Sequence, residues 1–223
     1  MKTIKKPPLV IFCHGFTGDK YEWGRFPKTA KRLNKKGYDA IIFDFSGSGE
    51  NKREPVLISK QISDLEDIFR WVKGLNYTKF ATIGLSFGGL TTLLTNLPVR
   101  TAIFWSPVFY LKQITNDSLY SHFPYKLPSA APPEIYIEEE FLRELKEINI
   151  EEHLQKFKTP SLIIHGKLDR TVKAELSVRA VGQIPSSINH KLHLVKNADH
   201  FFNNEQLEEF IDESIKWLQK YLE

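Results

Sequence analysis

Short apolar runs alternate along this chain with longer segments in which apolar residues recur at helical spacing. The apolar runs, which we predict to be buried strands, are residues 9–13, 38–43, 76–83, 100–105, 161–166 and 191–195. The segments predicted to be helices are residues 22–36, 59–73, 87–96, 174–181 and 205–221. Alternation of this kind is typical of βαβ units, in which a helix connects two parallel strands. The pattern predicts an α/β fold with a mostly parallel sheet of about six strands flanked by helices.

Residues 107–158 depart from this alternation. They are rich in proline and aromatic residues, and they contain one acidic amphipathic helix, predicted over residues 138–148. A connection of this length is unusual inside a compact domain. We therefore predict a small cap inserted after the strand that ends near Trp105, with residues 1–106 and 159–223 forming one core.

A serine between two glycines stands where the third predicted strand meets the following helix. The stretch Gly84-Leu85-Ser86-Phe87-Gly88 matches the G-x-S-x-G turn, in which a serine sits at the tip of a sharp strand-to-helix bend. The positions two before and two after such a serine must lack a side chain, and both are glycine here. The pattern predicts that Ser86 is a nucleophile. The alternative interpretation is a glycine-rich turn before a buried helix.

A serine hydroxyl attacks well only when a neutral imidazole takes its proton and a carboxylate orients that imidazole. His200 is the candidate base because it follows the last predicted strand, and Asp169 is the candidate acid because it follows the strand before it. Asp199 is a rival carboxylate, although its side chain should point away from that of its neighbour His200. The alternatives are that His200 is a surface-loop histidine and that Asp169 is a helix-capping or turn residue.

Acyl transfer also needs backbone N–H groups that converge on the developing negative charge. The helix after Ser86 points its free N–H groups at the serine oxygen, so the N–H of Phe87 is one candidate donor. The N–H of Phe16, in the loop after the first strand, is the second. We interpret His14 as a residue that braces this loop by bonding to backbone, and His165 as a packing residue.

The composition fits a globular protein, because hydrophobic residues make up 41% of the chain and charged residues 26%. The net charge of +4 arises from 31 Lys and Arg residues interspersed with 27 Asp and Glu residues, which favours a mixed solvated surface over a nucleic-acid partner. The single Cys13 excludes an internal disulfide and is interpreted as a small buried strand residue. The histidines lack metal-ligand spacing, so no metal site is predicted.

No apolar run approaches the length of a membrane span, and the first residues lack the long apolar segment of a signal peptide. We therefore expect a cytoplasmic protein. The oligomeric state is left open by the sequence.

The motifs taken together resemble the α/β-hydrolase superfamily. They are His14-Gly15-Phe16-Thr17-Gly18, the loop from Asp44 to Gly49, Gly84-Leu85-Ser86-Phe87-Gly88-Gly89, His165-Gly166 with Asp169, and Asp199-His200-Phe201. The order Ser, Asp, His along the chain is that of this fold. The size and the place of the cap are similar to those of cinnamoyl/feruloyl esterases and of monoacylglycerol-lipase-like carboxylesterases. The strand pair that usually opens the fold has no counterpart, so the resemblance implies six parallel strands.

The resemblance implies a serine carboxylesterase (EC 3.1.1.-) that hydrolyses a small acyl or aryl ester through an acyl-enzyme, without a cofactor. Ser86 would be the nucleophile, His200 the base and Asp169 the acid. Related activities stay open, namely a monoacylglycerol lipase, a thioesterase or a peptidase, as does a binding protein without catalysis. Aromatic residues of the cap could line a substrate pocket, or could simply pack the cap on the core: Phe109, Tyr110, Tyr120, Phe123, Tyr125 and Tyr136.

Overall fold

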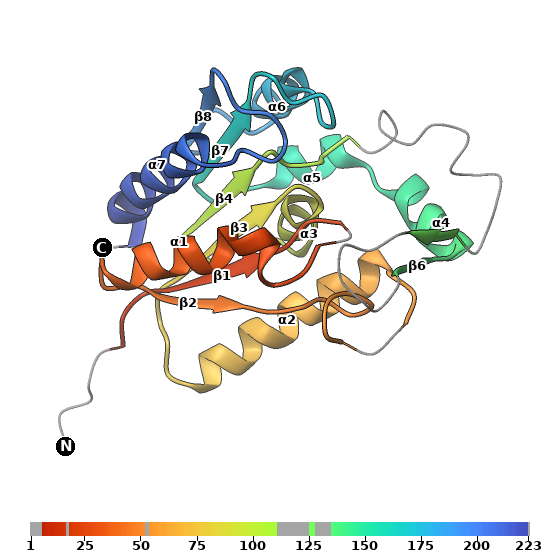
Figure 1. Ribbon diagram of the computed structural model, residues 1–223, viewed down its shortest axis with the longest axis horizontal. Helices are drawn as coiled ribbons and strands as arrows, with labels where there is room; N and C mark the ends of the chain where they lie inside the picture. The colour runs from red at the N-terminus through yellow and green to blue at the C-terminus, as the bar shows by residue number, and fades with distance from the viewer. Residues whose placement is uncertain (1–5, 17, 52–53, 111–124, 128–134, 223) are drawn as a thin grey trace.

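A twisted parallel sheet with helices on both faces forms the centre of the molecule (Figure 1). The computed structural model describes residues 6–16, 18–51, 54–110, 125–127 and 135–222. The strands of the large sheet are β1 (Leu9–Cys13), β2 (Asp39–Ile42), β3 (Phe80–Leu85), β4 (Thr101–Trp105), β7 (Ser161–Gly166) and β8 (His190–Val195). The helices are η1 (Glu22–Gly24), α1 (Arg25–Asn34), α2 (Ile58–Gly74), α3 (Phe87–Thr95), α4 (Glu139–Glu147), α5 (Ile150–Lys156), α6 (Ala174–Val181) and α7 (Glu205–Leu222).

The strand order in the sheet is β2-β1-β3-β4-β7-β8, and every neighbouring pair is parallel. The predicted parallel sheet of six strands is therefore confirmed. Because all strands run in the same direction, their carboxyl ends meet at one edge of the sheet. The loops after β1, β3, β7 and β8 carry the candidate site residues to that edge.

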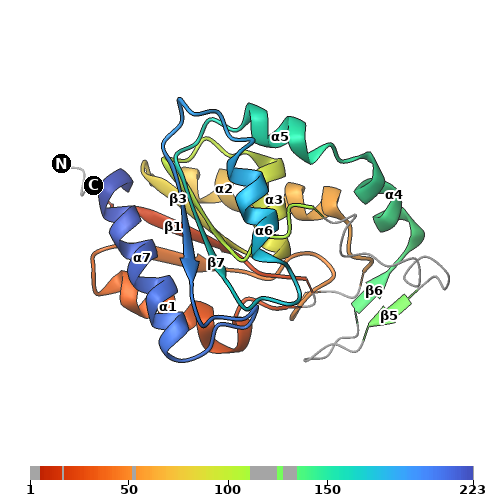
Figure 2. The ribbon, with the colours of Figure 1, turned by 90° about the horizontal axis from the view of Figure 1, so that it is seen from above.

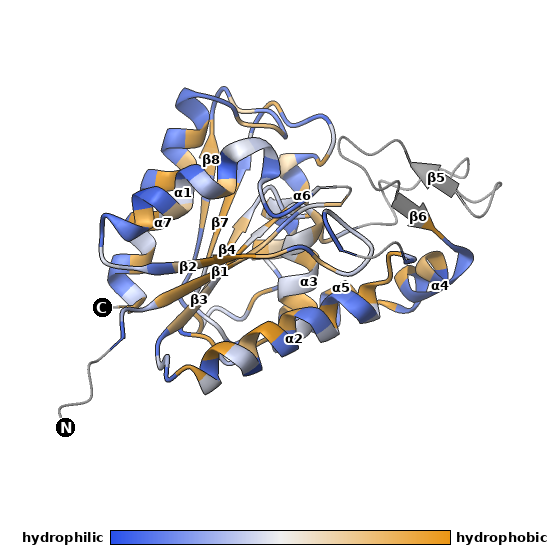
Figure 3. Cartoon of the chain, turned by 60° about the horizontal axis from the view of Figure 1, so that its bottom comes forward, coloured by the Kyte–Doolittle hydropathy of each residue, from blue (hydrophilic) through white to orange (hydrophobic). Residues whose placement is uncertain are grey.

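The sheet separates two apolar layers (Figure 2). Helices α1 and α7 cover one face, where Phe26 and Phe210 pack against Trp105. Helices α2, α3 and α6 cover the other. The strands are apolar along most of their length, whereas the helices also carry polar stretches (Figure 3). Burial on both faces explains why the strands read as continuous apolar runs in the sequence.

Cys13 lies in β1 with no exposed surface, which confirms the prediction of a buried strand residue. Burial raises the pKa of its thiol to about 12, against a smaller opposing effect of a hydrogen bond with Thr92. The thiol therefore stays neutral and unreactive at physiological pH.

The start of the first helix differs from the prediction. A helix was expected from residue 22, but Glu22–Gly24 form a short 3-10 turn and α1 begins at Arg25. Trp23 and Gly24 have φ angles of +52° and +86°, which lie in the left-handed region and interrupt the helix. Trp23 therefore lies outside α1, and its side chain is 63% exposed.

Strands β4 and β7 are neighbours in the sheet, so the chain between them leaves the core and returns to the adjacent position. This stretch contains the predicted helix, observed as α4, and three elements that were not predicted: α5 and an antiparallel pair, β5 (Tyr125–Leu127) and β6 (Ile135–Ile137). Helix α4 docks on α2 because the carboxylate of Glu144 accepts hydrogen bonds from the N–H groups of Ile58 and Ser59. The division into a core and a cap stays a prediction.

Every helix in the described parts of the chain is too short or too polar to cross a lipid bilayer.

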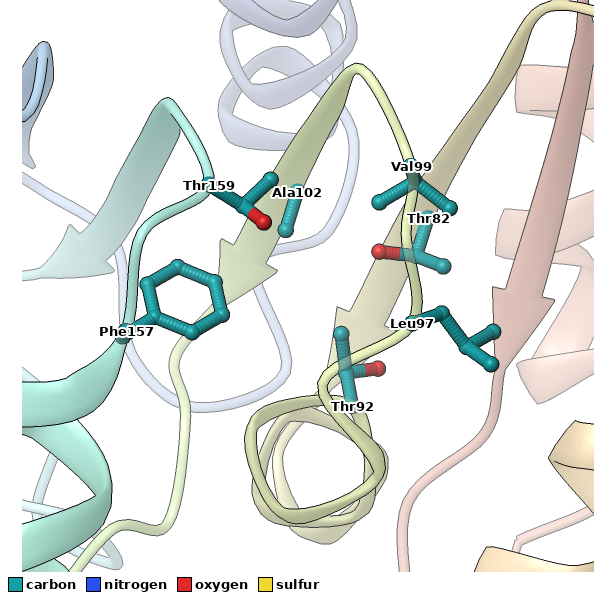
Figure 4. A pocket seen from close by; sticks show the side chains of 7 residues that line it. All are labelled: Thr82, Thr92, Leu97, Val99, Ala102, Phe157 and Thr159. Atoms are coloured by element: carbon teal, nitrogen blue, oxygen red, sulfur yellow. The ribbon is translucent and has the colours of Figure 1, made fainter.

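A narrow void lies between β3, α3 and β4, at the end of the sheet opposite the strand carboxyl ends (Figure 4). It is lined by Thr82, Thr92, Leu97, Val99, Ala102, Phe157 and Thr159. The void is too narrow to admit a water molecule. Within the described residues the buried hydroxyl of Thr82 has no hydrogen-bond partner, whereas that of Thr92 donates to the carbonyl of Gly88 at 2.8 Å. An unpaired buried hydroxyl destabilises the fold.

We expect Thr82→Val to stabilise the protein, because valine keeps the shape and removes the unpaired hydroxyl. The free energy of unfolding should rise by about 1 kcal/mol and the melting temperature by about 3 °C, as measured by calorimetry. Thr92→Val is the matched control, since it removes a paired hydroxyl from the same void and should bring no gain. A loss of stability in Thr82→Val would contradict the assignment of an unpaired group.

Candidate functional site

Ser86 stands on a strained turn between β3 and α3. Its φ and ψ angles are +53° and −116°, which a residue other than glycine rarely adopts. The turn is so tight that a Cβ added to Gly84 would lie 2.6 Å from the carbonyl oxygen of Gly88. A Cβ added to Gly88 would lie 2.2 Å from the carbonyl oxygen of Cys13, at the end of β1. The two glycines thus permit close contact within the turn and with the neighbouring strand.

The side chains of Ser86, His200 and Asp169 form one hydrogen-bonded row. His200 Nδ1 lies 2.7 Å from Asp169 Oδ2, and His200 Nε2 lies 3.1 Å from Ser86 Oγ. Since a carboxylate can only accept, Nδ1 carries the proton and Nε2 is left to accept the hydrogen of the serine hydroxyl. The structure therefore brings together the three residues selected from the sequence, with the imidazole in the tautomer that a general base requires.

Backbone contacts hold the loops of Asp169 and His200 against each other. The N–H of Lys167 donates to the carbonyl of Val195, and the N–H of Leu168 donates to the carbonyl of Ala198, both at 2.9 Å. A Cβ on Gly166 would lie 2.3 Å from the carbonyl oxygen of Ala198. The glycine is needed here because any side chain would push the two loops apart.

Asp169 is 6% exposed and accepts hydrogen bonds at both carboxylate oxygens. Oδ1 accepts from the N–H groups of Thr171 and Val172 at 2.9 and 2.7 Å, and Oδ2 lies 3.2 Å from Nε2 of His165 as well as near His200. Burial acts to raise the pKa of this carboxyl, but the hydrogen bonds from His165 and His200, the charge of His200 and the N–H of Val172 outweigh it and lower the pKa to about 2. Asp169 is therefore a carboxylate at neutral pH.

His165 has a larger part in the site than its interpretation as a packing residue suggested. Its ring is fully buried, with Nε2 facing two acceptors, the carbonyl of Val172 at 2.8 Å and Asp169. Its Nδ1 lies 2.7 Å from the hydroxyl of Ser177 on α6. Nε2 must therefore carry a proton, and His165 orients Asp169 from the side opposite to His200. The one signal of this contact in the sequence was that His165 stands four residues before Asp169.

Asp199 forms its hydrogen bonds with the backbone of its own loop. Its Oδ1 accepts from the N–H groups of Phe201 and Phe202 at 2.9 and 3.0 Å. These bonds close a turn that places His200 at the loop tip, so Asp199 shapes the loop and Asp169 is the carboxylate that contacts the imidazole.

The loop after β1 lies directly against Ser86. A Cβ added to Gly15 would be 3.3 Å from the Cβ of Ser86. The ring of His14 braces the loop, because Nδ1 lies 2.8 Å from the carbonyl of Gly15 and Nε2 accepts from the N–H of Phe45 at 3.1 Å. This confirms the expected role of His14. It also shows that the imidazole is neutral, since one nitrogen donates and the other accepts.

The N–H of Gly15 is itself occupied, since it donates to Glu22 Oε1 at 2.6 Å. Phe16 supplies the next N–H of this loop, and Phe87 supplies the first N–H of α3, which has no acceptor within its helix. These are the two groups selected from the sequence as oxyanion donors. Phe16 follows Gly15 in the loop against Ser86, and Phe87 is the residue after Ser86.

A buried ion pair fixes this loop to the loop of His200. The carboxylate of Glu22 and the guanidinium of Arg25 meet at 2.7 Å, with side chains only 2% and 5% exposed. Arg25 also donates to the carbonyl of Phe201 at 3.0 Å. The pair therefore joins the Gly15 N–H to the residue after His200. This ion pair was not predicted from the sequence, although the spacing of three residues between Glu22 and Arg25 was a possible signal.

Three phenylalanine rings meet beside Ser86. Phe16 lies 5.3 Å from Phe87 and 5.4 Å from Phe141 of α4, measured between ring centroids, and Phe87 lies 5.7 Å from Phe141. Both residues with candidate N–H donors thus contact the predicted cap through their side chains. Phe141 was not among the residues selected from the sequence.

Of the aromatic residues that were selected in the cap, Phe109 and Tyr110 have described side chains. Phe109 is buried against Phe104, and the ring of Tyr110 lies under the guanidinium of Arg179. Tyr120 and Phe123 lie outside the described residues, and only the backbone is described of Tyr125 in β5 and of Tyr136 in β6. No cluster of three or more His, Cys, Asp or Glu side chains in the described ranges is arranged to hold a metal ion.

Comparison with known proteins identifies the fold. Residues 8–95 match the family described as "alpha/beta hydrolase fold". The structure of Est1E from Butyrivibrio proteoclasticus with bound ferulic acid superimposes with a TM-score of 0.80 at 23% identity, covering 97% of this chain and 90% of that one. A monoacylglycerol lipase from Paleococcus ferrophilus superimposes with a TM-score of 0.77 at 19% identity, covering 97% of each chain.

A curated relative from Escherichia coli, described as an uncharacterized 31.7 kDa protein in the traX-finO intergenic region, is 32% identical over 89 residues. The match covers 38% of this chain and 30% of that protein, so the chain aligns with about a third of the length of its curated relative. The chain has the α/β-hydrolase fold, and the resemblance to this superfamily predicted from the sequence is confirmed.

The carboxylate of Asp169 gives the protein a pH-dependent part of its stability. Its pKa is about 2 in the folded chain and about 3.9 when unfolded, which corresponds to about 2 kcal/mol. Because the folded pKa is the lower one, this stability is present above about pH 4 and is lost as the pH falls towards 2. Urea unfolding of the wild type and of Asp169→Asn, which cannot titrate at this position, should show a steeper loss for the wild type below pH 4. Parallel curves would contradict the assigned pKa.

Proposed function

We propose that this protein is a serine carboxylesterase that hydrolyses a small acyl or aryl ester through a Ser86–His200–Asp169 triad. The observation that carries the proposal is the row of hydrogen bonds from Ser86 Oγ through His200 to Asp169, on a strained turn beside two backbone N–H groups. The fold supports it, because its carboxyl-terminal strand edge is where the family places its nucleophile.

In the first step, Ser86 Oγ attacks the acyl carbon of the ester. His200 Nε2 takes the hydroxyl proton as the bond between oxygen and carbon forms, and Asp169 stabilises the imidazolium that results. The carbonyl oxygen gains negative charge, which the N–H groups of Phe16 and Phe87 are placed to accept. Each such donor contributes about 3 kcal/mol to transition-state stabilisation.

The tetrahedral intermediate then collapses. The bond from the acyl carbon to the alcohol oxygen breaks, and His200 delivers its proton to that oxygen, so a neutral alcohol leaves and the acyl group stays on Ser86. In the second step His200 accepts a proton from water as the water oxygen bonds to the acyl carbon. The bond from that carbon to Ser86 Oγ then breaks, His200 returns the proton to Oγ, and the carboxylic acid leaves. The steps balance without a cofactor or metal.

A small apolar acyl group is the substrate part that the surroundings favour. The rings of Phe16, Phe87 and Phe141 form an apolar wall that joins the residue after Ser86 to α4. A thioester or the ester of a monoacylglycerol carries the same reactive carbonyl, so these remain alternatives within the proposal. The three rings themselves carry no charged group of the kind that an aminoacyl substrate would need.

The test compares hydrolysis of a short-chain aryl ester, a hydroxycinnamate ester, a medium-chain monoacylglycerol, an acyl thioester and an aminoacyl anilide. We expect the aryl ester to be cleaved with the highest kcat/KM. Ser86→Ala and His200→Ala should lower kcat by about 10⁶-fold and Asp169→Asn by about 10⁴-fold.

Asp199→Asn is the matched control for the carboxylate, since the amide oxygen can still accept the two N–H bonds of the loop. It should retain the wild-type rate. The triad is assigned wrongly if Asp199→Asn is inactive while Asp169→Asn is active. Preference for the thioester or the anilide would replace the substrate class while leaving the triad in place.

A further inference from the structure

Two large aromatic side chains stand exposed beside His200. Trp23 is 63% exposed and Phe201 is 49% exposed, and their ring centroids lie 6.1 Å apart at nearly a right angle. The ring of Phe201 also meets that of His200 edge to face, at 6.0 Å. The mechanism above uses neither residue. Large aromatic side chains that are exposed next to one another commonly mark a surface that binds a ligand or a partner.

The chain holds these rings in place rather than leaving them free. Glu22 and Trp23 have φ angles of +46° and +52°, a strained pair of left-handed residues that turns the indole outward. Behind the indole lies the guanidinium of Arg25, 5.0 Å from the ring centroid. Arg25 is in turn held by Glu22 and by the carbonyl of Phe201. The two rings are therefore oriented in advance, which lowers the entropic cost of binding a ligand.

Trp23 and Phe201 lie beside His200, where the alcohol half of an ester substrate would lie. His200 must reach the alcohol oxygen to protonate it, so the alcohol leaves on the side of the imidazole. The acyl carbon bonds to Ser86, and the next residue, Phe87, packs with Phe16 and Phe141. Phe201 packs instead against the ring of His200. The part of the substrate that extends past His200 towards Phe201 is the alcohol.

We propose that Trp23 and Phe201 bind the alcohol portion of the ester, and that this alcohol carries an aromatic ring. The proposal rests on the esterase function proposed above. An aromatic ring on the substrate can pack against Trp23 and Phe201 in the offset-stacked or edge-to-face geometries that aromatic rings prefer. Such contacts contribute more binding free energy than the burial of apolar area alone. The pair of exposed rings is thereby an alcohol-binding site for aryl or arylmethyl groups.

The step in which this site acts is acylation. While the alcohol oxygen is still bonded to the acyl carbon, its aromatic group rests on the two rings; when that bond breaks and His200 protonates the oxygen, the alcohol leaves the site. Deacylation contains no alcohol, so the site cannot affect its rate. The effect must appear in kcat/KM, which reports acylation, and must depend on the alcohol.

The experiment measures kcat/KM for three butyrate esters, those of methanol, benzyl alcohol and cyclohexylmethanol, by titration of the released acid. The ratio of benzyl to methyl ester should fall by about tenfold in Trp23→Ala and by about fivefold in Phe201→Ala, with the ratio partly restored in Trp23→Phe. The ratio of cyclohexylmethyl to methyl ester should fall less. Trp71→Ala is the matched control: Trp71 is 58% exposed on α2, in a separate groove with Asp64 and Asp67. Its ratios should equal those of the wild type.

Each outcome decides between the two proposals. If the wild type hydrolyses the esters but Trp23→Ala keeps the wild-type ratio, the alcohol-binding site is refuted and the esterase function stands. If the benzyl and cyclohexylmethyl ratios fall equally, the pair is a general apolar surface and the aromatic assignment is refuted. If the wild type hydrolyses none of the three esters, the proposed function itself fails.

Discussion

The site depends on how closely separate segments of backbone approach one another at the carboxyl ends of the strands. Gly88 brings the start of α3 against the end of β1, and Gly166 brings the loop after β7 against the loop after β8. At each place a single Cβ would fall inside the contact distance of a carbonyl oxygen. Parallel strands end at one edge in any such sheet, but only this proximity places Ser86, Asp169 and His200 within hydrogen-bond distance.

Two buried carboxylates make the arrangement rigid, and each is paired. Asp169 is satisfied by backbone N–H groups on one oxygen and by two imidazoles on the other. Glu22 is neutralised by Arg25 and holds Gly15 beside Ser86. An unpaired charge at either position would be costly, so the polar groups specify one geometry. Arg25 then connects both sides of the site, because it also contacts Phe201.

The fold and the three central residues could be predicted from the sequence because local patterns determine them. Strands buried on both faces are continuous apolar runs, and a serine bracketed by Gly84 and Gly88 has few structural uses. The start of α1 could not be predicted in this way. The residues from Glu22 to Gly24 continue the helical pattern of the sequence. Their left-handed φ angles arise because the carboxylate of Glu22 binds the N–H of Gly15 and the guanidinium of Arg25. Likewise, the contact of His165 with Asp169 depends on a turn whose geometry the spacing alone does not define.

Everything in the site depends on His200 making Ser86 reactive. The most direct test is labelling with a serine-directed fluorophosphonate, followed by peptide mass mapping. We expect one adduct, on the peptide that contains Ser86. We also expect no adduct in Ser86→Ala and labelling that is slower by orders of magnitude in His200→Ala. An adduct on another residue, or equally fast labelling without the imidazole, would contradict it.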